Sequence, residues 1–101
     1  MGRTHAKEMP EEISKRLLSK QAVVIKIATT CFFLICHPLK NFNWRVQIMS
    51  EEGKIAPLSR SISKEELINL YCKLGALTSS NKTLKDFVIK AKSIIKKLKN
   101  H

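Results

Sequence analysis

The chain has 101 residues, enough for one domain, and its 44% hydrophobic and 27% charged residues argue against a disordered chain. Lysine and arginine total 19 against 8 acidic residues, so the formal charge is +11, which favours acidic partners such as nucleic acid, anionic lipid or an acidic protein surface. The three cysteines, an odd number with apolar neighbours, argue against a disulfide framework. Reduced thiols of this kind predict a cytoplasmic or nuclear protein.

The first 20 residues are predicted to form a polar arm that ends in a short helix. Residues 1–12 are mostly polar and contain Pro10, whereas ISKRLLSK at 13–20 can form one or two helical turns. The segment 21–38 follows and is the most apolar part of the chain. Its β-branched residues favour a strand, its length favours a helix, and periodicity alone leaves both open.

A membrane anchor or a signal peptide is the alternative for residues 22–36. These 15 residues include Lys26 and fall short of the roughly 20 that a spanning helix needs. Basic residues precede the apolar stretch, as in a signal peptide, but His37 and Pro38 follow it in place of a small-residue cleavage site. We therefore prefer a buried core element.

The segment 41–50 alternates between apolar and polar side chains and predicts a half-buried strand. Phe42, Trp44, Val46 and Ile48 would share its buried side. A turn containing Gly53 and a returning strand are expected next. Pro57 restricts that returning strand to a sheet edge or a bulge.

Two amphipathic helices are predicted after these strands. Ser63 and Glu66 have the spacing of a capping box, and apolar residues at helical spacing continue to Leu77. Thr83 and Asp86 form a weaker cap for a second helix. Seven lysines between residues 82 and 99 accompany that single acid, so 78–101 is expected to contain a basic amphipathic helix.

Three local patterns resemble the COMM domain, the C-terminal module of the COMM domain-containing proteins. Residues 39–46, LKNFNWRV, are similar to the family's opening strand, and residues 50–58 resemble its serine-rich turn and the start of the next strand. Residues 63–77 are similar to the closing strand–helix junction and leucine-rich helix. One long apolar strand of the family pattern is missing before that helix. The resemblance therefore implies a shortened COMM-like module at 39–77, within an α+β fold that has a small antiparallel sheet, a C-terminal helix and an extra basic helix.

Catalytic and metal-binding patterns are not found in the sequence. The eight carboxylates lie in polar, turn or helix-start positions, and the three glycines are scattered rather than gathered in a phosphate-binding loop. Cys31, Cys36 and His37 have neither a zinc-site spacing nor an evident fourth ligand. We predict no enzyme activity, no metal site and no cofactor.

A non-enzymatic protein-interaction module is the preferred function. The small core is expected to leave an apolar surface that a partner chain must cover. The resemblance implies homo- or hetero-oligomers with COMM-domain proteins, assembly with coiled-coil scaffold subunits, and roles in endosomal recycling and in NF-κB or ubiquitin-ligase regulation. The residues expected to bind the partner are Phe42, Trp44, Val46, Ile48, Leu67, Leu70 and Leu74.

The alternative function is that of a small basic protein that binds an anionic membrane or nucleic acid through its lysine-rich C-terminal helix. Only four basic residues are arginine, the residue favoured for base readout and phosphate clamps, so a membrane surface is preferred to nucleic acid. The expected anion contacts are Lys90, Lys92, Lys96, Lys97 and Lys99.

Overall fold

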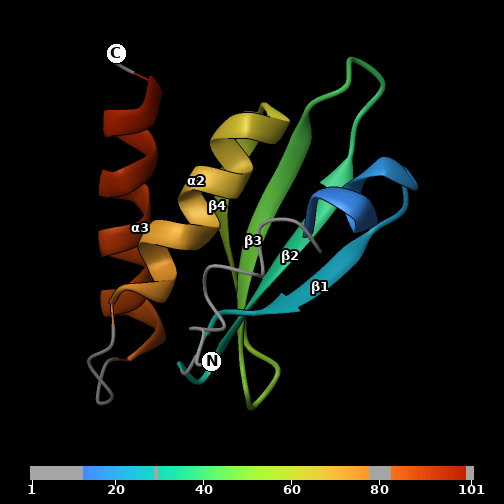
Figure 1. Cartoon of the computed structure of the whole chain (residues 1–101). Coiled ribbons are helices and arrows are strands. Elements are labelled where there is room, and N and C mark those ends of the chain that lie inside the picture. The colour runs from blue at the N-terminus through green and yellow to red at the C-terminus, as the bar shows by residue number, and fades with distance from the viewer. Residues whose placement is uncertain (1–12, 29, 78–82, 100–101) are drawn as a thin grey trace, which may run out of the picture.

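The protein has an α+β fold built on one antiparallel sheet with the strand order β1-β2-β3-β4. The structure, a computed structural model, describes residues 13–28, 30–77 and 83–99. Two long helices, α2 and α3, follow the four strands in the sequence (Figure 1). The bounds are β1 Val23–Lys26, β2 Phe32–Pro38, β3 Trp44–Ser50, β4 Ile55–Ile62, α2 Lys64–Gly75 and α3 Leu84–Lys99. The predicted fold class is confirmed.

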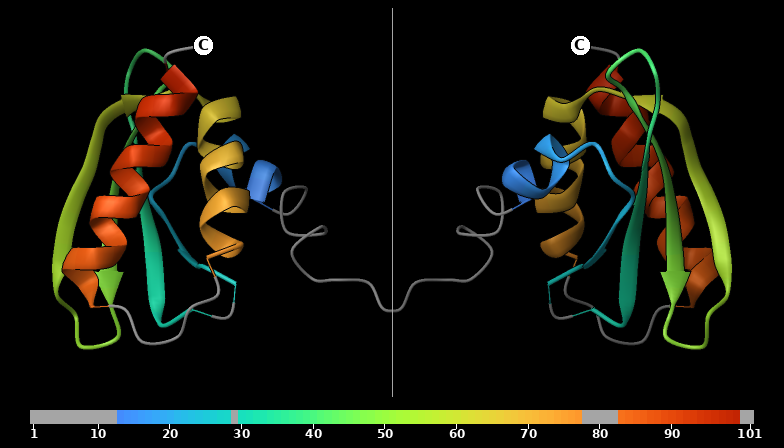
Figure 2. Two further views of the ribbon diagram at one scale, coloured as in Figure 1. Left: turned by 90° about the vertical axis from the view of Figure 1, so that its left-hand side faces the viewer. Right: turned by 90° about the vertical axis from the view of Figure 1, so that its right-hand side faces the viewer.

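The helices and the sheet form two layers. Figure 2 shows α2, α3 and the short helical segment at residues 13–18 on the same side of the sheet. The core cluster lies between these layers and includes side chains from every strand, from both long helices and from the 13–18 segment. The opposite face of the sheet carries no helix among the described residues. The described part of the chain therefore covers only one face of the sheet.

The apolar segment 22–36 folds as a hairpin, which the single-element alternatives did not include. Strands β1 and β2 pair antiparallel, with Val23 opposite Cys36 and Ile25 opposite Leu34, and all four side chains are buried. The Thr30 hydroxyl donates to the Ile27 carbonyl at 2.6 Å within the connecting turn. The segment is a core element, as preferred. None of the helices in the described part of the chain has the length and apolar character needed to cross a membrane.

Strand β3 begins at Trp44, later than its alternating pattern suggested. The prediction that Phe42 shares the buried side of this strand is wrong. Phe42 lies in the turn before β3 with a φ of 66°, and 74% of its surface is exposed. The backbone N–H of Leu39 donates to the Asn43 carbonyl at 2.9 Å and closes that turn. Because the chain reverses here, Phe42 does not continue the alternation of the strand.

Strand β4 returns along β3 at the edge of the sheet, as Pro57 requires. The pairing shifts register between Val46 and Gln47, and Pro57 is the partner of Gln47 beside that shift. Residues 55–62 make a complete eight-residue strand. The predicted returning strand is therefore present.

Both predicted helix caps are present. The Ser63 hydroxyl accepts from the Glu66 N–H at 3.1 Å, and the Glu66 carboxylate accepts from the Ser63 N–H at 3.1 Å, which completes the capping box of α2. The Thr83 hydroxyl accepts from the Asp86 N–H at 3.1 Å at the start of α3. These caps fix where the two helices begin.

The N-terminal segment is more than an arm. Ile13 and Leu17 are 0% and 2% exposed and belong to the core cluster. They lie one helical turn apart, so a single short helix buries both. The arm predicted at residues 1–12 lies outside the described residues.

Candidate binding surfaces

The residues predicted to bind a partner lie in the protein's own core. Trp44 is 4% exposed, and Val46, Ile48, Leu67, Leu70 and Leu74 are all 0% exposed. Leu67, Leu70 and Leu74 lie on α2 within the predicted module. The core around these residues is completed by α3 and the 13–18 segment, both of which the sequence analysis placed outside the module at 39–77. Phe42 is the only one of the seven that is exposed. The expectation that a second chain must complete this core is therefore corrected.

A different apolar surface lies on the uncovered face of the sheet. Strand pairing places Val24 of β1 beside Ile35 of β2. It also places Met49 of β3 between Phe33 of β2 and Ile55 of β4. None of these five residues belongs to the core cluster between the layers. We name Val24, Phe33, Ile35, Met49 and Ile55 the open-face strip.

Exposure along the open-face strip rises toward the sheet edges. Val24 on β1 is 48% exposed and Ile55 on β4 is 53% exposed, whereas the central Ile35 is 8% exposed. Phe33 and Met49 are half-buried. The strip is therefore an apolar band that crosses all four strands.

Basic and polar side chains border the open-face strip. The Lys26 ammonium lies 6.0 Å from the centroid of the Phe33 ring and donates to the Thr30 carbonyl at 2.8 Å. His37 Nε2 and Gln47 Oε1 lie 2.8 Å apart, and Arg45, opposite His37 on β3, is exposed. The face combines an apolar centre with a positive border.

The second surface is the lysine-rich side of α3. One side of this helix packs on the sheet through Phe87, Val88, Ala91 and Ile95. The five lysines predicted as anion contacts are exposed, and Asp86 is the single acid in the helix. The Lys99 ammonium donates to the Ser61 carbonyl at 2.6 Å, which ties the end of α3 to β4.

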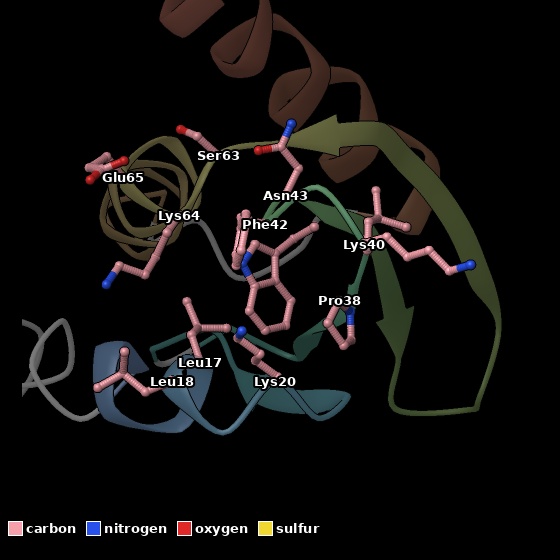
Figure 3. A pocket seen from close by; sticks show the side chains of 12 residues that line it. Leu17, Leu18, Lys20, Pro38, Lys40, Phe42, Asn43, Ser63, Lys64 and Glu65 are labelled. Atoms are coloured by element: carbon pink, nitrogen blue, oxygen red, sulfur yellow. The ribbon is translucent and has the colours of Figure 1, made fainter.

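A groove with a volume of about 740 Å³ lies at one end of the molecule (Figure 3). Three segments meet there: residues 17–20, the turn between β2 and β3, and the start of α2. Sequence reasoning missed it because these segments are far apart in the chain. Its lining residues are Leu17, Leu18, Lys20, Pro38, Leu39, Lys40, Phe42, Asn43, Trp44, Ser63, Lys64 and Glu65.

The cysteines offer no metal site among the described residues, where no group of three or more metal-ligating side chains is found. Cys36 is buried, and this burial raises the pKa of its thiol from 9.0 to about 12. Cys31 and Cys72 are exposed and free. A buried neutral thiol is neither a good metal ligand nor a nucleophile.

Comparison of the chain with protein-family models, with curated proteins and with solved structures finds no significant match. The resemblance to the COMM domain therefore depends on the local patterns at residues 39–77 alone.

Proposed function

We propose that the protein is a non-enzymatic protein-interaction module that binds another polypeptide through the open-face strip. The proposal is carried by a difference between the two faces of the sheet. One face is covered by the core and the helices, whereas the other face has an uncovered apolar band. Contiguous exposed apolar surface on a small protein marks an interaction site more often than it serves the fold. Val24 and Ile55, each about half exposed, are the side chains with most surface left to bury.

Charge indicates what kind of chain fits this face. A second copy would carry the same formal charge of +11, and the resulting repulsion weakens self-association at low salt. An apolar patch bordered by Asp and Glu would complement Lys26 and Arg45. Charge therefore favours a hetero-oligomer over a homodimer.

The resemblance to the COMM domain supports a more specific version of the proposal. On that basis the partner is another COMM-domain chain, in an assembly with coiled-coil scaffold subunits. The associated processes would be endosomal recycling and the regulation of NF-κB or ubiquitin ligases. The corresponding location is the cytoplasm, the nucleus or the endosome surface.

The test is association of the Ile55→Glu variant, which places a charge in the strip. Sedimentation velocity over a concentration series measures self-association, and co-expression with individual COMM-domain chains measures hetero-association. We expect Ile55→Glu to abolish the complex formed by the unmutated chain.

Leu18→Glu is the matched control, since Leu18 is 66% exposed and lies at the groove rather than on the open face. It should leave the complex intact. The proposal fails if neither a second copy nor a COMM-domain chain binds in a manner that depends on Ile55.

A second candidate function is binding of an anionic surface through α3, because this helix carries several exposed lysines and a single acidic residue. The variant Lys96→Gln/Lys97→Gln should weaken binding to anionic vesicles and reduce its salt dependence by about one unit of slope per lost contact. The double variant Lys54→Gln/Lys73→Gln removes the same charge from exposed positions outside α3. Equal losses in the two variants would show a diffuse effect of net charge and would exclude a site on α3.

A further inference from the structure

We propose that the groove at the end of the molecule binds a small amphipathic carboxylate, of the chemical class of a single-chain fatty acid. The groove lies between the 13–18 segment and the start of α2, on the helix side of the sheet, so it is separate from the open-face strip. Its volume of about 740 Å³ lies within the range of small-molecule sites, about 300–1,000 Å³. The inference is independent of the proposed partner chain.

The walls of the groove are apolar and partly exposed. Leu18 and Phe42, at 66% and 74%, are the two most exposed large hydrophobic residues in the described part of the chain, and both line this groove. Leu17 and Trp44 also line it and are otherwise buried in the core. An apolar tail in the groove would cover the exposed Leu18 and Phe42 side chains. It would also contact the outer edges of Leu17 and Trp44.

Three lysine side chains contribute to these walls, and Figure 3 shows that the end of Lys40 points away from the groove. Lys20, Lys40 and Lys64 line the groove, and Glu65 is the only carboxylate among the described residues of its lining. Figure 3 shows Lys20 on the side of the 17–20 segment and Lys64 on the opposite side, at the start of α2. Charge in the groove is therefore positive, with one acid against three bases.

The Lys20 ammonium has a defined position over the groove. It lies 4.8 Å from the centroid of the Phe42 ring, a cation–π contact that holds the charge against an apolar wall. Glu65 and Glu66 occupy the first turn of α2 and offset the positive end of its dipole, so the positive charge at the groove comes from the lysines. A ligand with one anionic head and one apolar tail matches this polarity.

Trp44 supplies the measurement, since it is the only tryptophan in the chain and it lines the groove. Its emission is followed while dodecanoate is added below the micellar concentration. We expect a saturable change with a stoichiometry of one. Dodecyltrimethylammonium has the same tail and the opposite charge, and it should produce no saturable change.

Two variants and a charge-matched control locate the site. Lys20→Gln/Lys64→Gln should raise the Kd for dodecanoate about tenfold or more, because two of the three lysines that attract the carboxylate are lost. Lys54→Gln/Lys73→Gln, which has the same net charge, should leave the Kd unchanged. Phe42→Asn removes the exposed aromatic wall at a positive-φ position that asparagine adopts readily, so it should weaken binding in a stably folded protein.

Three outcomes would overturn the inference. Absence of any saturable change in Trp44 emission would show that the groove does not bind the carboxylate. An equal response to dodecyltrimethylammonium would show apolar adsorption without recognition of the charge. Binding that occurs only with micelles or anionic vesicles would assign these residues to a membrane contact.

Discussion

The three cysteines differ in environment and should differ in reactivity. Cys36 points into the core from β2 and its pKa is raised to about 12, whereas Cys31 and Cys72 are exposed. Reaction with a thiol reagent needs the thiolate and access to solvent. The reactivity of each thiol therefore depends on whether its place in the fold exposes it to solvent.

We predict that at pH 8 the folded protein reacts rapidly at Cys31 and Cys72 and slowly at Cys36, as measured by alkylation and mass spectrometry. Denaturant should make all three equally reactive. Because the folded state raises the pKa of Cys36 from 9.0 to about 12, its contribution to stability is complete below pH 9 and is lost as the pH rises toward 12. Rapid alkylation of Cys36 in the native protein would contradict its burial.

The hydroxyl of Ser63 is the acceptor half of the capping box on α2. Replacing it with alanine leaves the Glu66 N–H without this acceptor, so Ser63→Ala should lower the free energy of unfolding by about 1 kcal/mol in urea denaturation. Ser93→Ala, at an exposed position within α3, is the control and should change stability by less. Equal effects would indicate that the cap does not stabilise α2.

At the scale of elements, α3 is both part of the core and the carrier of the lysines. Its Phe87 ring stacks on Phe32 of β2, with centroids 4.4 Å apart and planes 18° apart. Phe87 is 1% exposed, whereas Ile89, two residues later, is 58% exposed. The helix cannot leave the sheet for another surface without exposing this aromatic pair.

Phe87→Ala should therefore destabilise the protein by about 3–5 kcal/mol, while Ile89→Ala should cost under about 0.5 kcal/mol. Thermal and urea unfolding measure both. A small effect of Phe87→Ala would mean that α3 is not an integral part of the domain.

At the scale of the whole molecule, folding and pairing are separate properties. The core is closed on the helix side by the chain itself, and the open-face strip lies on the other side of the sheet. Trp44 belongs to the core, whereas Ile55 belongs to the open-face strip. Substitutions at these two positions should therefore have different consequences.

We predict that Ile55→Glu remains folded and unfolds cooperatively while it loses its partner. Trp44→Ala should cost about 3–5 kcal/mol and reduce the population of the folded state itself. Near-ultraviolet circular dichroism and urea unfolding distinguish the two effects. A disordered Ile55→Glu protein would instead show that the partner is needed for folding.

Local patterns in the sequence determined much of the fold. The capping box at Ser63, the helical spacing up to Leu74, the edge position of Pro57 and the alternation from Trp44 to Ile48 all correspond to observed elements. Each of these features depends on neighbours within a few residues. Features that depend only on near neighbours can be predicted from local sequence patterns.

Only the tertiary structure decided which apolar residues remain exposed after the helices pack on the sheet. Trp44 and Ile55 lie on strands of the same sheet, but the helices cover only the face to which Trp44 points. The groove at Lys20 and Lys64 likewise exists only because segments far apart in the chain meet. The burial of a side chain depends on which faces of the sheet and helices pack together. Local sequence patterns do not predict that packing.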